Sequence, residues 1–227
     1  MVEYILTRFK RKSISVNIGK DAKVYVKAPI EVPISCIENF IVSKSSWIEK
    51  NVELANEIIK QKDNFIIKEG HLLKILEENY PVHVIKGNNY GFDGEVFYVP
   101  EKLSQNELKS CLVEIYKVIA KSIITTKVNK FSKIMDVEPG NIKINSAKTR
   151  WGSCSGENNL NFTWKLIMAS EKQVDYVVIH ELAHIKEHNH SEKFWKIVCN
   201  IFPDYKKIKK SLVDLHYGLY KEGWNDL

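Results

Sequence analysis

The clearest structural signal in the chain is a helix that begins near Ser170. Gln173 follows three residues later, a spacing that forms a capping box at helix N-termini. Apolar side chains then recur every three or four residues, which places them on one helix face. These residues are Val174, Val177, Val178, Leu182 and Ile185. The segment is therefore predicted to bury one face in the core and to hold its polar side chains in a fixed register.

The same helix carries the pattern His180-Glu181-Leu182-Ala183-His184. Residues four apart lie on one helix face, so both imidazoles can bind one ion. Glu181 is close enough to take a proton from a water that a metal activates. The pattern predicts a metal site with Glu181 as general base. We expect one zinc ion per chain, because nitrogen-rich sites with an open position suit zinc, although nickel, cobalt or copper also bind such donors.

A catalytic zinc site needs a third protein ligand. His188 would lie about 12 Å along the helix axis from His180, too far to share its ion. His190 is the better candidate. Asn189 can adopt the left-handed conformation that ends helices and Ser191 can cap the next helix, so His190 would lie in a tight bend near the metal.

Two alternatives to this ligand set stay open. Glu192 could replace His190 as third ligand, or the histidines could simply lie on the surface of an amphipathic helix. The remaining histidines have no partner at ligand spacing and are expected to be structural or solvent-exposed. They are His71, His83 and His216.

Length and composition are those of a globular protein with a real core. The chain has 227 residues, of which 44% are hydrophobic and 27% charged, enough for one large domain or two small ones. Its apolar stretches are far shorter than the roughly 18 to 20 residues of a membrane span, which excludes a transmembrane protein. The first residues lack a signal-peptide pattern and no CxxC pair occurs, so we expect a cytoplasmic protein in which most of the four cysteines are buried small apolar residues.

In the first half, residues 13–28 alternate between apolar and polar side chains, which predicts a β-hairpin. Ser35 and Glu38 have capping-box spacing, and the helix they open is expected to reach about Gln61, with a break near 43–46. Two further strands joined by a turn are predicted between Gly70 and Pro100, within the apolar runs 82–85 and 96–99.

In the second half, Ser104 and Glu107 predict a second capping box that opens a long amphipathic helix, stopped by Pro139-Gly140. Strands are expected around 142–144 and 160–164. The fold class is therefore α+β. Residues 1–103 form an N-terminal β-rich region with one or two helices. Residues 104–227 form a core with the long helix, a small antiparallel sheet, the His180 helix and C-terminal helices, although no linker marks the boundary near Leu103.

Several motifs, in order, resemble the YgjP-like, SprT-related family of zinc-dependent hydrolases. The matching stretches are Thr149-Arg150-Trp151-Gly152-Ser153-Cys154-Ser155, Leu160-Asn161, Tyr176-Val177-Val178-Ile179-His180-Glu181-Leu182-Ala183-His184 and Asn189-His190-Ser191-Glu192-Lys193-Phe194-Trp195. With the early segment 11–16 and Ala28-Pro29, the likeness spans nearly the whole chain. It implies a minimal zincin-like metallopeptidase core in which His180, His184 and His190 bind zinc and Glu181 is the catalytic base.

The predicted function is a zinc metallopeptidase with a peptide or protein substrate. In the family picture, the strand near Gly152 can present an edge to which an extended peptide adds. Arg150 could position the substrate or stabilise an oxyanion, but an internal salt bridge explains it equally well.

Two other functions stay open. One is a metal-dependent hydrolase of nucleotides or other phosphoanhydrides, with lysines or Arg150 holding phosphate. The other is a non-catalytic protein that binds nucleic acid through its basic clusters, since the net charge is +6. These clusters are Arg8, Lys10, Arg11 and Lys12, and Lys206, Lys207, Lys209 and Lys210. Oligomeric state cannot be read from the sequence.

Cys154 lies in a Gly-x-Cys-x-Gly pattern, the spacing of a nucleophile elbow. That motif requires a helix directly after it. Here a polar turn at 157–159 and a strand from Leu160 are expected instead, so Cys154 is assigned to a strand and turn beside the metal-binding helix.

Overall fold

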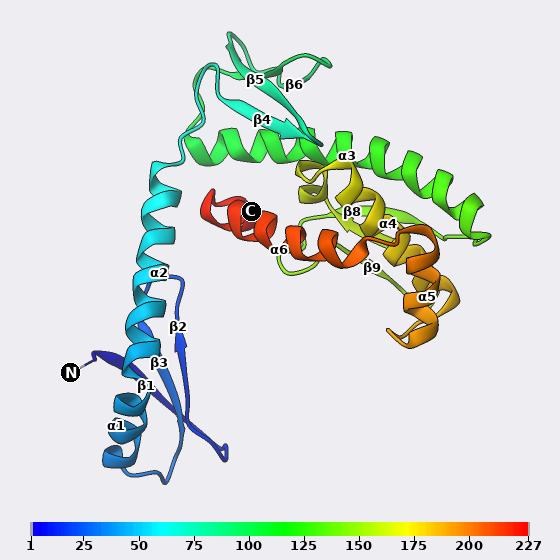
Figure 1. Cartoon of the computed structure of the whole chain (residues 1–227). Coiled ribbons are helices and arrows are strands. Elements are labelled where there is room, and N and C mark those ends of the chain that lie inside the picture. Colours follow the sequence, from blue (N-terminus) through cyan, green and yellow to red (C-terminus); the bar gives the residue numbers. More distant parts are fainter. Residues whose placement is uncertain (1, 227) are drawn as a thin grey trace. The chain divides into compact units, whose positions relative to one another are not determined.

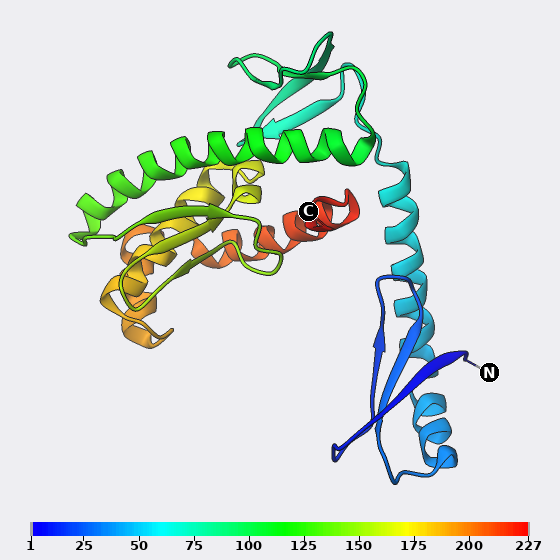
Figure 2. The same cartoon turned by 180° about the vertical axis from the view of Figure 1, so that it is seen from behind.

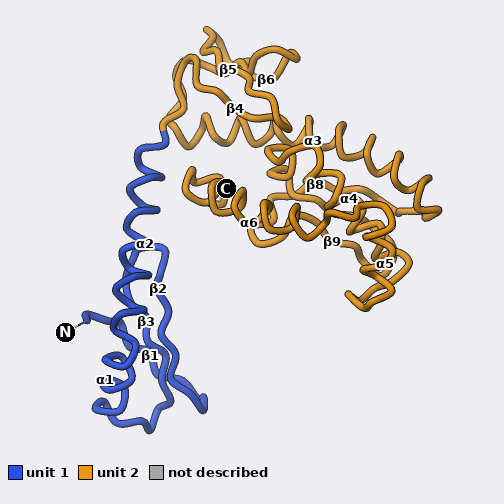
Figure 3. The backbone as a smooth tube through the Cα atoms, in the orientation of Figure 1, with its two compact units in different colours: residues 1–65 blue, residues 66–227 orange. Residues whose placement is uncertain are grey.

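The computed structural model describes residues 2–226, which fall into two compact units, Met1–Phe65 and Ile66–Leu227 (Figure 3). In the first unit, β2 and β3 form the predicted antiparallel hairpin, and β1 adds to β3 in parallel. Buried side chains of β3 pack against Ile37, Ile41 and Ile48 of the two helices. The elements are β1 (Tyr4–Phe9), β2 (Ser15–Ile18), β3 (Val24–Pro29), α1 (Ile34–Ser43) and α2 (Ser45–Asn64).

The predicted cap at the start of α1 is wrong. The N-cap residue is Pro33, and no side chain caps the helix. Proline's fixed φ, here −58°, already suits a helix start, so the helix begins before Ser35 can act as a cap. The break between α1 and α2 occurs at Lys44, within the predicted interval.

The second unit begins with a four-stranded sheet in the order β4-β5-β7-β6. β5 contains the predicted run 82–85, and β7 contains residues 97–99 of the second run. The two strands pair in parallel, because the chain first forms β6 at the far edge of the sheet and then returns antiparallel to it as β7. The sheet packs on α3 and η1: the Tyr116 hydroxyl donates to the Lys74 carbonyl (3.0 Å), and Leu76 N–H donates to the Ile167 carbonyl (2.7 Å). The strands are β4 (Leu72–Ile75), β5 (Glu78–Ile85), β6 (Gly91–Phe92) and β7 (Phe97–Pro100).

These contacts join residues 66–103 to the rest of the second unit. The compact units therefore meet between Phe65 and Ile66, whereas the sequence placed a boundary near Leu103. The reason is long-range packing, which no local pattern in the sequence reveals.

The central element of the second unit is α3 (Gln105–Met135). It lies between the four-stranded sheet and α4 in both views of the ribbon (Figures 1 and 2). Its predicted capping box forms, since the Ser104 hydroxyl accepts from Glu107 N–H and the Glu107 carboxylate accepts from Ser104 N–H. The helix ends at Asp136, which adopts the left-handed conformation (φ 49°).

A three-stranded sheet follows in the order β8-β10-β9. It is mixed rather than wholly antiparallel, because β8 pairs with β10 in parallel and β9 pairs with it antiparallel. β9 is therefore an edge strand, and it packs beside α4. These elements are β8 (Ile142–Asn145), β9 (Gly152–Cys154), β10 (Leu160–Thr163), η1 (Trp164–Met168), α4 (Glu171–Lys186), α5 (Glu192–Ile201), α6 (Tyr205–Lys221) and η2 (Trp224–Asp226).

The fold is α+β, as predicted, and the long helix α3, the β8-β10-β9 sheet and α4 all belong to the second unit. Among the helices within residues 2–226, none combines the length and apolar character needed to cross a membrane.

Candidate metal centre

Helix α4 is fixed at its start by its predicted capping box. The Ser170 hydroxyl accepts from Gln173 N–H (3.3 Å), and the Gln173 side chain accepts from Ser170 N–H (2.8 Å). The Gln173 amide also donates to the Ser211 hydroxyl of α6 (2.9 Å). The cap thus ties α4 to α6, the two helices whose side chains line the site.

Three imidazoles converge at the C-terminal half of α4. His180 and His184 come from the helix and His190 from the loop before α5, and one ring nitrogen from each lies within 4.8 Å of the others. Nε2 of His180 and Nε2 of His190 are 3.0 Å apart. Two nitrogens bound to one tetrahedral zinc are about 3.3 Å apart, since each bond is about 2.0 to 2.1 Å long. The donor set and spacing therefore fit one divalent metal ion.

The loop after α4 reaches His190 in a different way from the one predicted. The helix ends at Glu187 in an extended conformation, and Asn189 is not left-handed. Asn189 instead accepts a hydrogen bond from Ser191 N–H through its side-chain oxygen (2.9 Å). Ser191 caps α5 as predicted, with its hydroxyl accepting from Phe194 N–H (3.4 Å). An asparagine turn and a serine cap thus set the bend.

The alternative third ligand, Glu192, and the rejected candidate His188 lie outside this cluster. His188 and Glu192 are both exposed, and neither belongs to the group of converging ligand atoms that occurs within residues 2–226.

Phe194 forms the apolar support of the cluster. It is fully buried, and its ring centroid lies 4.9, 4.5 and 4.7 Å from those of His180, His184 and His190. Contact with all three rings restricts their orientation. The sequence analysis did not single out this residue, although an aromatic three residues after a helix cap and four after a candidate ligand was a usable signal.

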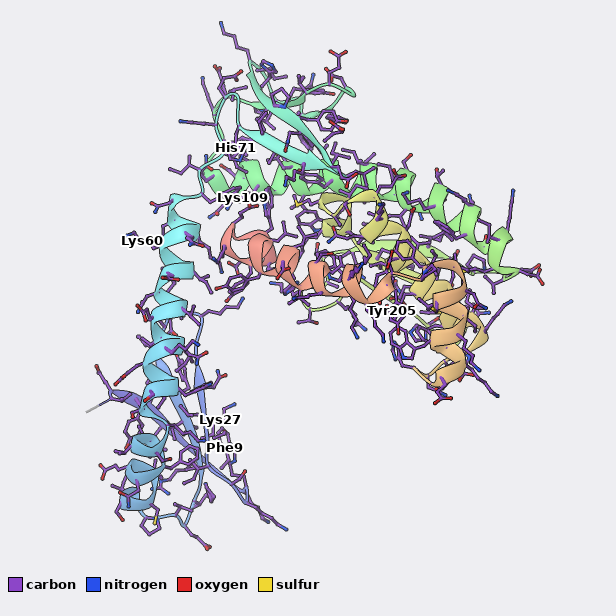
Figure 4. All side chains as sticks on the ribbon, viewed as in Figure 1. Phe9, Lys27, Lys60, His71, Lys109 and Tyr205 are labelled. Atoms are coloured by element: carbon purple, nitrogen blue, oxygen red, sulfur yellow. The ribbon has the colours of Figure 1, made fainter. Side chains whose placement is uncertain are left out.

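A second aromatic layer lies outside the first. Tyr205, at the start of α6 beside α5 (Figure 4), stacks on Trp195 with centroids 4.9 Å apart. Trp195 in turn contacts the rings of His180 and His190, at 5.9 and 5.6 Å. These rings shield one side of the site from water.

The two helical histidines are held in the neutral form that metals bind. Burial, reinforced by the neighbouring histidines and Lys209, lowers the pKa of His180 to about 3. Burial also lowers the pKa of His184. Nδ1 of His184 lies 3.2 Å from the Glu187 carbonyl, which can only accept, so Nδ1 carries the proton and Nε2 is free for a metal. The other ring nitrogen of His180, Nδ1, is buried without a hydrogen-bond partner among the described residues.

Glu181 is buried next to the cluster, with 6% of its surface exposed. Burial raises the pKa of its carboxyl to about 8, against an opposing effect of Arg150. A cation held by the three imidazoles would favour the ionised form. The side chain packs directly on β9: a Cβ atom on Gly152 would lie 2.7 Å from Glu181 Cγ and 2.8 Å from Oε1.

A cavity of about 410 Å³ opens beside His180 and Glu181. Arg150, the predicted substrate-binding residue, lines it, and so does His216, which the sequence placed among the structural or exposed histidines. Sequence reasoning gave Tyr176 no role here and placed Lys209 only within a basic cluster, because the two residues come from different helices and no local pattern brings them together. The remaining lining residues are Thr149, Trp151, Gly152, Val177, Leu212 and Val213.

The other candidate features do not form a second site. Cys154 ends β9 and is followed by a turn and β10, so the nucleophile elbow is absent. The Arg8 guanidinium donates to the carbonyls of Pro29, at the end of β3, and of Ile30 and Val32 after it, which gives Arg8 a structural role. Of the four lysines in the cluster on α6, only Lys209 lines the cavity.

Two histidines four residues apart on one helix, with a glutamate directly after the first, are typical of metal-dependent peptidases. The chain belongs to the YgjP-like family: the family model described as "YgjP-like, metallopeptidase domain" matches residues 12–214. It is therefore a metallopeptidase that uses a divalent metal. No curated protein matches the sequence.

Two solved structures are partly similar to this chain. The metallopeptidase zymogen abylysin of Pyrococcus abyssi is 23% identical over 40% of this chain and 92% of its own, with a TM-score of 0.38. The metallopeptidase zymogen jannalysin of Methanocaldococcus jannaschii is 26% identical over 40% of this chain and 94% of its own, with a TM-score of 0.37.

Proposed function

We propose that the chain is a zinc peptidase in which His180, His184 and His190 hold one zinc ion and Glu181 is the general base. The observation that carries this proposal is the convergence of three imidazole nitrogens within 4.8 Å, beside a buried carboxylate on the wall of a cavity. Zinc is the preferred metal because three nitrogen donors with room for a further ligand suit it.

The chemistry divides between the metal and the chain. A zinc ion bound there would polarise a peptide carbonyl and lower the pKa of a water to about 7. Glu181 takes the proton of the attacking water on its carboxylate and returns it to the amide nitrogen that leaves, so the carboxylate is regenerated. Burial of Glu181 against Gly152 limits its movement, which keeps the carboxylate next to the reacting groups.

The edge strand β9 gives the substrate a means of alignment. Its first residue, Gly152, lines the cavity together with Glu181, and β9 is one of the two edge strands of its sheet. An extended peptide can pair with such an edge through main-chain hydrogen bonds, which bind peptides of many sequences. Arg150, at the entrance to this strand, is proposed as a substrate-binding residue. A cytoplasmic location also stays a prediction.

The test is peptide cleavage by zinc-loaded protein, comparing the wild type with Glu181→Gln. We expect the variant to keep one zinc per chain and to lose at least about a hundredfold in kcat/KM, because general base catalysis contributes about 10² to 10⁴. Glu157→Gln, an exposed glutamate in the β9–β10 turn, is the matched control and should cleave like the wild type. Retained turnover in Glu181→Gln would remove Glu181 from the mechanism.

A further inference from the structure

The cavity beside Glu181 is lined by an excess of positive and hydrogen-bond-donating groups. Arg150 precedes β9, Lys209 and His216 project from α6, and Glu181 is the one acidic residue on the wall. Within residues 2–226, the side chains of Arg150 and Lys209 form neither a hydrogen bond nor an ion pair closer than 4 Å. Lys209 Nζ lies over the Trp195 ring, 5.5 Å from its centroid, a contact that leaves its N–H donors without a hydrogen-bond acceptor. The donors of both residues are therefore available to a ligand.

A buried lysine acts on one residue of this wall. Lys165 has 2% of its surface exposed, and its Nζ donates to Asn225 Oδ1 (2.6 Å). Burial lowers the pKa of Lys165 to about 8, against an opposing effect of Asp226. Burial and the charge of Lys165 together lower the pKa of His216, so this imidazole lines the cavity as a neutral hydrogen-bonding group.

The rest of the cavity wall is apolar. Val177 on α4, Leu212 and Val213 on α6 and Trp151 beside β9 supply this surface. The volume, about 410 Å³, is near the small end of the range for ligand pockets, about 300 to 1,000 Å³. Such a cavity suits a short group that combines an apolar portion with a negative charge.

We propose that this cavity binds the C-terminal residue of a peptide substrate, with its carboxylate held by Arg150 and Lys209 and its apolar side chain against Val177 and Leu212. The proposal rests on the proposed peptidase function. A chain-terminal residue brings an apolar side chain and a carboxylate within one residue, whereas an aspartate or glutamate side chain would leave the apolar walls without a partner. Arginine's planar fork can bind both carboxylate oxygens at once. The enzyme would then act as a carboxypeptidase.

The test uses three probes of matched sequence: acetyl-Ala-Ala-Leu with a free carboxylate, its C-terminal amide, and acetyl-Ala-Ala-Glu amide. Binding is measured by calorimetry on zinc-loaded Glu181→Gln, which separates binding from turnover, and kcat/KM is measured on the wild type. Both are repeated in an Arg150→Ala background, with Lys210→Ala as control, because Lys210 is exposed on α6 and does not line the cavity.

The free acid should bind at least about tenfold more tightly than its amide, because a charge-assisted hydrogen bond is lost in the amide. Arg150→Ala should remove this preference by weakening only the free acid, and Lys210→Ala should leave it intact. Equal binding of acid and amide would overturn the proposal. So would a preference that Arg150→Ala leaves unchanged, since Arg150 would then take no part in binding the carboxylate.

The remaining outcomes distinguish a terminal carboxylate from other ligands, and failure of the carboxylate site from failure of the peptidase function. Preferential binding of the glutamate probe, or Arg150-dependent binding of ATP that exceeds that of the free acid, would overturn the terminal-carboxylate proposal in favour of a side-chain carboxylate or a phosphate. Selective binding of the free acid without cleavage of any peptide would support the carboxylate site and contradict the peptidase function. Cleavage of the acid and the amide at equal rates would support the peptidase function and contradict the carboxylate site.

Discussion

Glu181 fits beside β9 only because residue 152 has no side chain. A Cβ atom at Gly152 would come within 2.7 to 2.9 Å of three Glu181 atoms, so Gly152→Ala must displace the carboxylate. We predict a loss of about a hundredfold in kcat/KM, the cost of a 1 Å misplacement of a catalytic group, with zinc still bound. Gly156→Ala is the matched control, since a Cβ there meets nothing within 4 Å. Equal activity of Gly152→Ala and Gly156→Ala would contradict the tight packing of Glu181 against Gly152.

The buried Glu181 also predicts how the stability of the metal-free protein depends on pH. Its pKa is about 8 when folded and near 4.5 when unfolded, so between these values the folded state holds a proton that the unfolded state has lost. Its contribution to stability therefore falls as pH rises through this window. Gln cannot ionise, so the stability of Glu181→Gln should increase relative to that of the wild type as pH rises from 5 to 8.

This prediction is checked by thermal unfolding of both metal-free proteins at pH 5 and pH 8. The difference in Tm should grow by several degrees in favour of Glu181→Gln, since about 1 kcal/mol corresponds to about 2 to 4 °C in a chain of this size. A difference in Tm that is the same at both pH values would mean that burial does not raise the pKa of the Glu181 carboxyl.

The residues of the site differ in how far sequence could reveal them. His180, Glu181 and His184 follow from helix periodicity, because spacing along one helix fixes their relative positions. His190 was predicted through the loop and its serine cap, although the assumed role of Asn189 was wrong. The contacts of Gly152 and His216 join segments far apart in the chain, so no local pattern places them near Glu181.

At the scale of elements, α4 is held against α3 by an ion-pair network. Lys127 Nζ lies 2.8 Å from Glu171 and 2.6 Å from Asp175, and the Lys127 side chain is 10% exposed. We predict that Lys127→Ala lowers the free energy of unfolding by about 1 to 3 kcal/mol. The ion pair with Glu171 contributes little to this free energy, because Glu171 is largely exposed to solvent. Most of the loss comes from Asp175, whose carboxylate would lose its partner at a largely buried position.

Urea unfolding measures this effect, with Lys133→Ala as the control on an exposed face of the same helix. Zinc content should be unchanged in Lys127→Ala, because the network joins the start of α4 rather than the histidine cluster. A change in free energy no larger than that of the control would show that apolar packing alone holds α3 to α4.

Elements whose signals are local were predicted best. The capping boxes at Ser104 and Ser170 formed, because the spacing of two side chains determines them. At Ser35 the same spacing failed because Pro33 starts the helix earlier. The parallel pairing of β5 with β7 was missed, since alternation within a strand does not specify its partner.

At the scale of the whole molecule, the second unit contains all the residues of the candidate site, from Thr149 to His216. The family match nevertheless spans both units, from residue 12 to residue 214. The α+β class was predictable because the periodicities of helix and strand occur in both halves. The division at residue 65 was not, because it depends on how β4 to β7 pack on α3.

The most direct test of the account is zinc content per chain, measured by mass spectrometry on protein purified without a histidine tag. The wild type and Glu181→Gln should each hold about one zinc, and His190→Ala should hold far less, because it loses one of three ligands. Zinc uptake by His190→Ala equal to that of the wild type would contradict the three-histidine site. Absence of zinc uptake by the wild type would contradict the metal chemistry on which the proposed function rests.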